Sequence, residues 1–188
     1  MNREPYPYNA RMRRFFLISC AVVLSHAALT AQARKETVEG IRNLTRVDAV
    51  VACAGATAPE AIPGLAAQGF KSIVNLRLAT EPGAAIEESK AAAEAARIKY
   101  IHLPFNGSEP DIKVADAFIM AVADPANQPV FIHCGSANRV GALWLAKRML
   151  VDRWAQDKAL EEARMIGLSS DALETFALDY VAKRRGGR

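Results

Sequence analysis

The sequence predicts an α/β domain with a parallel-type central sheet of about four to five strands, flanked by helices and followed by a helical C-terminal part. Three observations predict this class. Short runs rich in Val, Ile or Leu alternate with helical segments, three helical segments follow the last run, and 51% of the 188 residues are apolar. Strands separated by helices are joined by crossovers, which place the strands parallel and cover both faces of the sheet.

Four short segments are predicted as strands because they are rich in β-branched and aliphatic residues: 48–53, 71–76, 99–103 and 130–133. Helices are expected between and after them, at about 57–69, 84–96, 114–123, 140–151, 155–166 and 171–183. One domain with a single sheet accommodates all these elements.

Local signals predict where several helices begin and end. Thr57-Ala58-Pro59-Glu60 has the form of a capping box with an early proline, and Gly69 closes that helix. Asp111 occupies an N-cap position before the helix at 114–123. Gly167 separates the last two helices.

The first 33 residues have the pattern of an export signal. Arginines precede the apolar run 15–29, and Ala31-Gln32-Ala33 follows it. Cleavage after Ala33 would leave a domain at 34–182 with a basic tail at 183–188, in the periplasm or outside the cell. The run is shorter than the ~20 residues a membrane span needs, so we expect no stable span after cleavage, with an uncleaved membrane anchor as the alternative.

Charge and cysteine content exclude some classes of partner. The formal net charge is +4, but residues 1–33 hold four arginines and one glutamate, so the remainder carries +1. No basic patch for nucleic acid is therefore expected. Two cysteines, Cys53 and Cys134, remain after cleavage, which is too few for a disulfide framework, and no closely spaced pair suggests a metal site.

The residues that indicate chemistry lie where strand 130–133 runs into the next helix. The intervening sequence Cys134-Gly135-Ser136-Ala137-Asn138-Arg139 is a loop of small residues with a cysteine at its start and an arginine at its end. Such a loop can turn several backbone N–H groups toward an anion, and the helix N-terminus adds partial positive charge. We expect Cys134 to be a thiolate nucleophile and Arg139 to bind two phosphoryl oxygens with its planar fork of donors.

The sequence resembles the cysteine-dependent protein tyrosine and dual-specificity phosphatases, especially the bacterial group similar to beta-lactamase hydrolase-like phosphatases. The resemblance covers about Arg46 to Gly167. Four ordered blocks carry it: Ala58 to Gly69, Ile73-Val74-Asn75-Leu76-Arg77 with Glu81-Pro82-Gly83, Tyr100 to Pro104, and His133-Cys134 through Arg139-Val140-Gly141. It implies a dual-specificity-phosphatase-like fold and a phosphatase that forms a phosphocysteine intermediate, without metal or other cofactor.

The resemblance also implies roles for residues around the loop. Gly135, Ser136, Ala137 and Asn138 would bind substrate together with Arg139, and an acidic residue would protonate the leaving oxygen. Asp111 is the first candidate for this acid and Glu109 the second, although Asp111 also fits a purely structural N-cap.

Other residues near the loop have both functional and structural interpretations. His133 would tune the thiolate by hydrogen bonding, or be an ordinary buried histidine at a strand end. Ser136 could stabilise the departing thiolate and Asn138 could orient the loop or a water, although both are common turn residues. Arg77 and Glu81 would shape the pocket rim or pair with each other.

One feature departs from the family: its usual loop has five residues between cysteine and arginine, and this chain has four. Rhodanese-type sulfurtransferases use a loop of this shorter length around a persulfide. A sulfurtransferase using a Cys134 persulfide and a phosphate-binding protein without turnover are therefore the alternatives. The substrate is expected to be a phosphate monoester, such as phosphotyrosine or phosphoserine/threonine, whose identity the sequence does not give.

Overall fold

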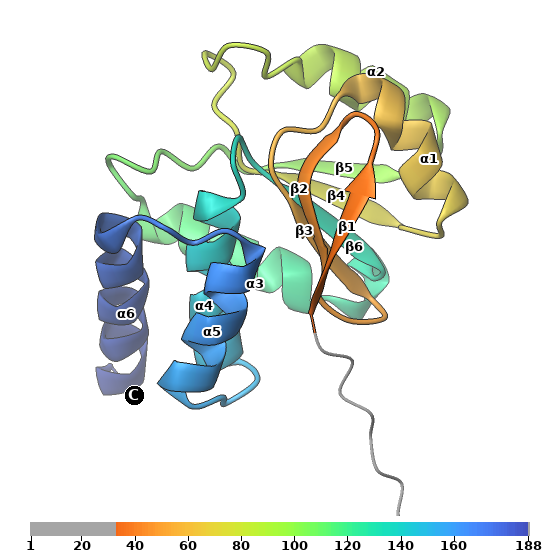
Figure 1. Cartoon of the computed structure of the whole chain (residues 1–188). Helices are drawn as coiled ribbons and strands as arrows, with labels where there is room; N and C mark the ends of the chain where they lie inside the picture. Colours follow the sequence, from red (N-terminus) through yellow and green to blue (C-terminus); the bar gives the residue numbers. More distant parts are fainter. Residues whose placement is uncertain (1–32, 188) are drawn as a thin grey trace, which may run out of the picture.

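The computed structural model describes residues 33–187. In this part of the chain the strands are β1 (Arg34–Val38), β2 (Ile41–Arg46), β3 (Val51–Ala54), β4 (Ser72–Asn75), β5 (Lys99–His102) and β6 (Val130–His133). The α-helices are α1 (Ile62–Ala67), α2 (Ile86–Ala95), α3 (Ile112–Ala123), α4 (Asn138–Leu150), α5 (Gln156–Ile166) and α6 (Asp171–Gly186) (Figure 1).

The strands form a single sheet in the order β1-β2-β3-β6-β4-β5. Strands β3, β6, β4 and β5 run parallel to one another, whereas β1 and β2 form a hairpin at one edge that pairs antiparallel with β3. The predicted α/β class with a mainly parallel sheet is confirmed, and the four predicted strands are all present. β6, which leads to Cys134, lies in the middle of the parallel part.

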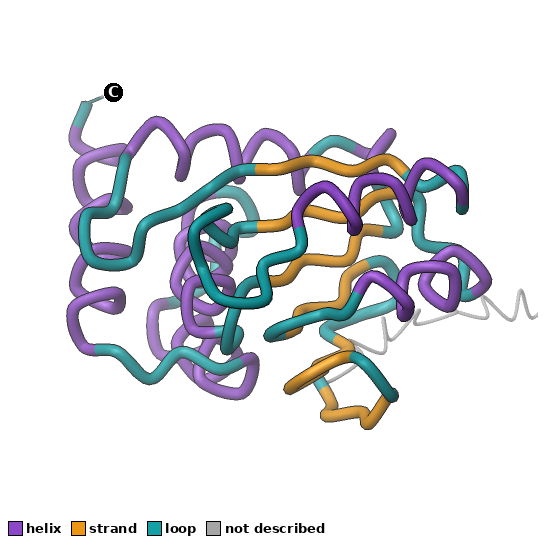
Figure 2. Tube along the Cα trace, turned by 90° about the horizontal axis from the view of Figure 1, so that it is seen from above, coloured by secondary structure: helices purple, strands orange, loops and turns teal. Residues whose placement is uncertain are grey.

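Helices cover both faces of the sheet (Figures 1 and 2). On one face α1 and α2 pack over a core that includes Leu65, Ile73 and Phe131. On the other face α3 to α6 enclose a larger core that includes Ile132 and Trp144. Because side chains alternate along a strand, successive residues of β6 enter opposite cores.

The hairpin strands β1 and β2 were not predicted, for a physical reason. β1 is an edge strand with charged, exposed residues such as Arg34 and Lys35. In β2, Asn43 adopts the left-handed conformation with φ of 51°, which disturbs the alternation of buried and exposed residues. The period-2 signal is therefore missing from both strands.

The segment after β3 differs from the predicted capping box. The hydroxyl of Thr57 donates to the carbonyl of Gly55 at 3.2 Å instead of capping a helix. Ala58 is the N-cap of a short 3-10 segment, Pro59–Ala61, that continues directly into α1. Gly69 has a φ of +86° just after α1, as expected of the glycine that ends a helix.

The C-terminal helix is longer than predicted. α6 begins after the N-cap Ser170 and continues to Gly186, so most of the predicted basic tail is helical. Arg184 pairs with Asp116 of α3, and Nη2 of Arg185 donates to the carbonyl of Met149 at 2.8 Å. These contacts attach the last turn to the domain.

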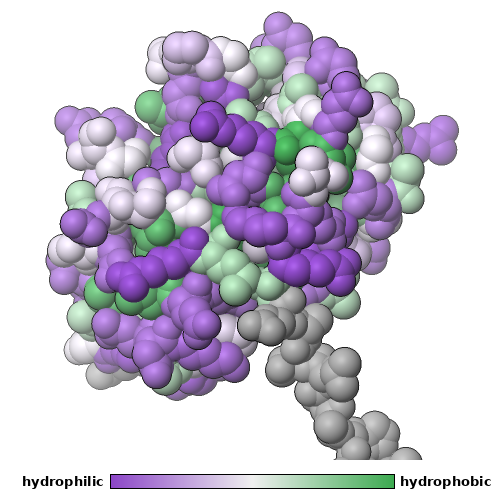
Figure 3. Space-filling model, viewed as in Figure 1, coloured by the Kyte–Doolittle hydropathy of each residue, from purple (hydrophilic) through white to green (hydrophobic). Residues whose placement is uncertain are grey.

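The predicted export signal lies outside the described residues. Among residues 33–187, no helix is both long and apolar enough to cross a membrane. The face shown in Figure 3 is dominated by hydrophilic residues, with apolar ones in separate spots.

Candidate active site

The carboxyl ends of the parallel strands meet at one edge of the sheet. His133 is in register with Ala54 on β3 and with Asn75 on β4, which is in turn in register with His102 on β5. Ligands of such sheets bind beyond this edge, where the strand order reverses. The loop that starts at Cys134 emerges there, from the central strand.

Backbone contacts with the β3 end hold the first part of the loop. The N–H of Cys134 donates to the carbonyl of Ala54 at 3.3 Å, and the N–H of Ala56 donates to the carbonyl of Gly135 at 2.9 Å. A Cβ at Gly55 would lie 3.2 Å from the carbonyl oxygen of Gly135, so the two segments approach as closely as glycine allows.

The second part of the loop turns into helix α4. Ala137, the N-cap of α4, has a φ of 77°, and the N–H of Gly141 donates to its carbonyl at 2.9 Å. In the described part of the chain, the backbone N–H groups of residues 135–140 donate to no protein acceptor. A run of unengaged N–H groups at a helix N-terminus is a site for an anion.

Cys134 lies at the floor of this loop. The residue is fully buried and its side chain belongs to the core on the α3–α6 face. The free thiol therefore borders the apolar core, at the residue where the loop begins.

Arg139 is held by three segments of the chain. Its Nη1 donates to the carbonyl oxygens of Leu76 at 3.2 Å and Phe105 at 3.0 Å, and to Oε1 of Glu81 at 2.6 Å. Its Nη2 donates to Oε2 of Glu81 at 2.9 Å. A guanidinium has five N–H donors, so these contacts leave Nε–H and one N–H of Nη2, which lie on the same side of the fork. Two such donors match two oxygens of a phosphoryl group.

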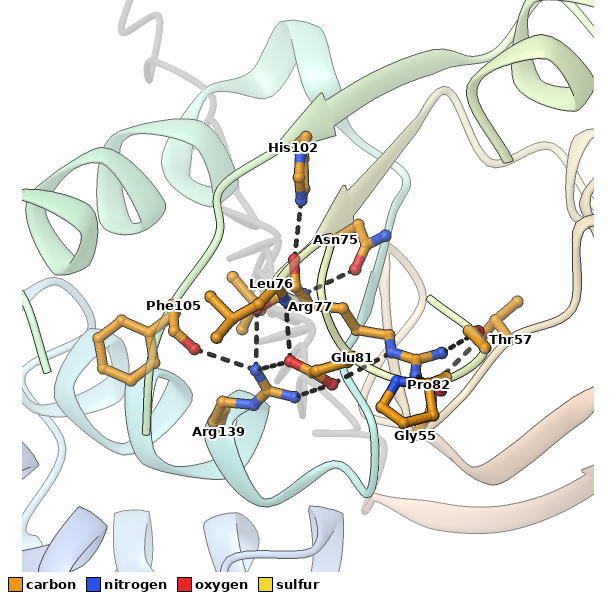
Figure 4. A network of polar contacts seen from close by, with 12 residues as sticks. Gly55, Thr57, Asn75, Leu76, Arg77, Glu81, Pro82, His102, Phe105 and Arg139 are labelled. Atoms are coloured by element: carbon orange, nitrogen blue, oxygen red, sulfur yellow. Dashed lines mark hydrogen bonds and ion pairs between the residues drawn. The ribbon is translucent and has the colours of Figure 1, made fainter. Parts of the chain in front are cut away.

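Glu81 lies between two arginines (Figure 4). In addition to Arg139, it pairs with Nε of Arg77 at 3.3 Å and accepts the N–H of Leu78 at 2.8 Å. Burial alone would raise the pKa of Glu81, but the hydrogen bonds from Arg139 and Leu78 outweigh it and lower the pKa to about 2. Likewise, burial would lower the pKa of Arg139, and the hydrogen bonds to Glu81 raise it above the ordinary value.

Arg77 is buried and fixed by its backbone partners. Its Nη2 donates to the carbonyl of Pro82 at 2.7 Å, and its guanidinium also contacts the carbonyl of Gly83 at 2.5 Å. The predicted Arg77–Glu81 pair is therefore present, and it holds the loop that follows β4 against the site.

His133 is buried and points to the opposite face from Cys134, beside the ring of Phe131 at 5.9 Å between centroids. Burial, reinforced by the charge of Arg77, lowers the pKa of His133 to about 3, so the ring is neutral at physiological pH. Its Nδ1 has no partner within the described residues. The geometry contains no side-chain hydrogen bond from His133 to the sulfur, and its proposed tuning of the thiolate stays a prediction.

Asp111 is the N-cap of α3, as the sequence predicted. Its Oδ1 accepts the N–H of Lys113 at 2.8 Å, and the residue is exposed. Glu109 is exposed in the same loop. This loop reaches the site through Gly107, where a Cβ would lie 3.5 Å from Cγ of Arg139. The cap and the acid role are compatible, because Oδ2 makes no hydrogen bond within the described residues.

The side chains of the loop have different surroundings. Ser136 is exposed and its hydroxyl makes no hydrogen bond to the described residues. The Oδ1 of Asn138 accepts the N–H groups of Ser169 at 3.1 Å and Ser170 at 3.3 Å, at the start of α6. Asn138 thus joins the loop to α6 through its side chain, and its backbone N–H is one of the unengaged groups at residues 135–140.

Two further buried residues, Cys53 and Trp144, lie in the core on the α3–α6 face. Cys53 is buried and in register with Ile132, two residues before Cys134, and burial raises the pKa of its thiol well above the ordinary value. Trp144 is also buried, and its Nε1 donates to Glu162 at 2.6 Å, so it belongs to the core.

Several solved structures share this fold, and some of them are described as phosphatases. A putative phosphatase from Shewanella putrefaciens aligns with a TM-score of 0.65 at 18% identity, over 77% of this chain and 94% of that one. The core catalytic domain of the PP-IP phosphatase SIW14 from S. cerevisiae aligns with a TM-score of 0.64 at 22% identity, over 80% and 94%. TpbA from P. aeruginosa aligns with a TM-score of 0.59 at 20% identity, over 79% of this chain and 88% of that one. The class that the fold defines is a phosphatase-like α/β domain.

The chain belongs to the family of the phosphatase-like domain of beta-lactamase hydrolase-like proteins, whose family model matches residues 41–150. The beta-lactamase hydrolase-like protein of Agrobacterium fabrum is 41% identical over 95 residues. That alignment covers 48% of this chain and 21% of the relative, so the chain spans only a small part of the relative's length.

Sequence reasoning missed the link between Glu81 and Arg139 and the carbonyl groups that hold Arg139. The Arg77–Glu81 pair has a local signal, because the two residues are four apart. The Arg139–Glu81 contact joins residues 58 apart and needs the sheet order. The contact of Asn43 with the loop was missed for the same reason, since β2 was not predicted.

Proposed function

We propose that the protein is a cysteine-dependent phosphatase that hydrolyses phosphate monoesters through a phosphocysteine intermediate. The observation that carries this proposal is the combination of a free cysteine, a run of unengaged N–H groups at residues 135–140, and an arginine that keeps two donors beyond those used by Glu81, Leu76 and Phe105. A dianionic phosphoryl group matches this set of donors in charge and shape.

In the first step, the thiolate of Cys134 attacks phosphorus. The S–P bond forms as the P–O bond to the leaving group breaks, and the leaving oxygen takes a proton from an acid, for which Asp111 is the candidate. The N–H groups of the loop and the fork of Arg139 stabilise the charge on the equatorial oxygens.

In the second step, water attacks phosphorus and the S–P bond breaks. Sulfur leaves as the thiolate, the water gives its proton to the carboxylate, and inorganic phosphate is released. The proton taken from water restores the acid, and the enzyme returns to its starting state. Every atom in this cycle comes from the ester, water and the named side chains, so the cycle requires no cofactor.

Export of the protein to the periplasm or beyond is part of the proposal. β1 starts at Arg34, so cleavage after Ala33 would leave the sheet whole. Sequencing the N-terminus of the mature protein should give Arg34 first; a start at Met1 would contradict cleavage. The partner is then a phosphorylated molecule in that compartment, with no role for nucleic acid or for a stable membrane span.

The four-residue spacer supports a second candidate, sulfur transfer through a Cys134 persulfide. A persulfide also carries negative charge, which the loop N–H groups would stabilise. The fixation of Arg139 favours the phosphatase, because a phosphoryl group presents oxygens to the two-donor fork throughout the cycle, whereas in sulfur transfer the thiosulfate donor presents them and the persulfide does not.

The test is hydrolysis of an aryl phosphate by residues 34–188, under reducing conditions and without metal. Cys134→Ser and Arg139→Lys should each abolish turnover while the protein stays folded. Cys53→Ala is the matched control, because it removes the other cysteine and should leave turnover in place. Thiocyanate formation from thiosulfate and cyanide, without phosphatase activity, would establish sulfur transfer instead, and sulfate binding without either activity would indicate a pseudophosphatase.

A further inference from the structure

Asn43 of β2 contacts the loop that follows Cys134. Its Nδ2 donates to the carbonyl of Ser136 at 3.1 Å and to the carbonyl of Ile166, near the end of α5, at 3.1 Å. The side chain therefore joins the edge hairpin to the loop and to a helix on the α3–α6 face.

Lys35 of β1 fixes the orientation of this amide. Its Nζ donates to Oδ1 of Asn43, to Oγ1 of Thr45 at 2.9 Å and to the carbonyl of Ile166 at 3.2 Å. Because an ammonium group only donates, Oδ1 must face Lys35, and Nδ2 must then face the two carbonyl oxygens. The orientation of the Asn43 amide is therefore fixed by its hydrogen-bond partners.

The packing around the amide is tight. A Cβ at Gly167 would lie 2.9 Å from Nδ2 of Asn43, 2.9 Å from Cβ of Ala137 and 3.3 Å from the carbonyl oxygen of Ser136. A side chain at Gly167 would therefore push Asn43 and the loop apart.

The three central carbonyl groups of the loop each have an anchor. The N–H of Ala56 holds the carbonyl of Gly135, Asn43 holds that of Ser136, and the N–H of Gly141 holds that of Ala137. In a planar trans peptide, the N–H points away from the C=O of the same unit. Anchoring these carbonyl groups on the outside therefore directs the next three N–H groups, at residues 136–138, to the inside of the loop.

We propose that Asn43 is a positioning residue for the anion-binding loop, and that it keeps the N–H of Ala137 directed at the phosphoryl group. Of the three anchors, it is the one made by a side chain, so it can be removed without changing the backbone of the loop. This role rests on the proposed function, and it makes binding of the phosphoryl group depend on the hairpin. Without this anchor, the peptide between Ser136 and Ala137 can rotate and place a carbonyl oxygen where an anion should bind.

Asn43→Gly is the informative variant. Glycine accepts the left-handed φ of 51° without strain, so the backbone of the hairpin should be kept even though the side-chain contacts with Lys35 and Ile166 are lost. Loss of the donor should weaken binding of sulfate about fivefold, the size expected for one hydrogen bond, and lower kcat/KM for an aryl phosphate at least as much. Asn43→Asp keeps the oxygen that faces Lys35 but places a second acceptor oxygen against the two carbonyl oxygens. Its sulfate affinity and kcat/KM should therefore fall further than those of Asn43→Gly.

Arg97→Gly is the matched control. Arg97 is exposed, has a φ of 57° and lies between α2 and β5, so the change of residue type and backbone freedom is comparable. Its sulfate affinity and kcat/KM should stay at the level of the unmodified protein. The unfolding temperature of all three variants is measured as well. A variant that binds sulfate weakly but unfolds at the normal temperature has lost the loop geometry and kept the fold.

The outcomes distinguish this proposal from the proposed function. The positioning role would be overturned if Asn43→Gly had the same sulfate affinity and kcat/KM as the unmodified protein. It would also be overturned if the decreases in sulfate affinity and kcat/KM simply paralleled the decrease in unfolding temperature. If the unmodified protein binds sulfate but hydrolyses no ester, the phosphatase proposal fails and the sulfate affinities still decide on Asn43. If the unmodified protein does not bind sulfate, there is no anion loop to position and this proposal falls as well.

Discussion

Replacing Glu81 by glutamine tests how the site holds its arginine. Glutamine has nearly the same shape, and its carbonyl can still accept one N–H of Arg139. Its amide group, however, would face the second N–H of the fork, and both Arg139 and Arg77 would lose their anionic partner. The perturbation thus removes one charge and one acceptor without creating a cavity.

The size of the effect follows from the carboxyl group itself. A pKa lowered to about 2, from an ordinary value of ~4.3, corresponds to at most about 3 kcal/mol of stabilisation of the ionised form. The side chains of Arg139 and Glu81 are 14% and 23% exposed, so solvent screens part of this. We expect Glu81→Gln to lower the free energy of unfolding by about 1–3 kcal/mol at neutral pH.

The sign of the pH dependence is fixed by the direction of the shift. A carboxyl group with a lowered folded pKa contributes its stability above its unfolded pKa of ~4.3, and the contribution disappears as pH falls through the folded value of about 2. The difference in unfolding free energy between the two proteins should therefore be constant above about pH 5 and shrink between about pH 4 and pH 2.

The assay combines denaturant unfolding across this pH range with aryl phosphate hydrolysis. We expect kcat/KM to fall about ten- to a hundredfold, since Arg139 would no longer be held in one orientation. Glu88→Gln, at an exposed position of α2, is the control for loss of a carboxylate. Unchanged unfolding and unchanged kcat/KM in Glu81→Gln would refute the role that the contacts assign to Glu81.

Three further predictions address the acid, the packing of α4 and the core. Asp111→Asn should keep the cap of α3 and the stability of the protein, because Asn is an equally good N-cap. In a series of esters with different leaving groups, it should slow the hydrolysis of alkyl esters more than that of esters with a good leaving group. Gly141→Ala should cost about 2 kcal/mol in chemical denaturation, since its Cβ would lie 2.8 Å from the carbonyl oxygen of Ala163. Trp144→Phe should cost about 1–3 kcal/mol in the same assay, because buried Glu162 loses a donor, while kcat/KM stays unchanged.

The part of the fold that carries the site was predictable from the sequence. The buried run 130–133, the loop of small residues and the following helix are local features, and each has a clear signal. The N-cap Asp111 and the glycines at 69 and 167 were predictable for the same reason, since caps depend on a few adjacent residues.

Contacts between distant segments were not predictable. The capping box at Thr57 was wrong because the hydroxyl found a partner in Gly55, at a point where β3 turns toward the loop. The end of α6 was underestimated because its basic residues find tertiary partners, such as Asp116 for Arg184. The roles of Cys134, Arg139, Asp111 and His133 in catalysis stay predictions until they are measured.

The central claim is that Cys134 becomes phosphorylated during turnover. Rapid acid quenching of the protein with an aryl phosphate, followed by mass spectrometry of its peptides, tests this directly. A phosphoryl group is expected on the peptide that contains Cys134, and none on that peptide in Cys134→Ser. Steady hydrolysis with no phosphoryl group on Cys134, or undiminished hydrolysis by Cys134→Ser, would contradict it.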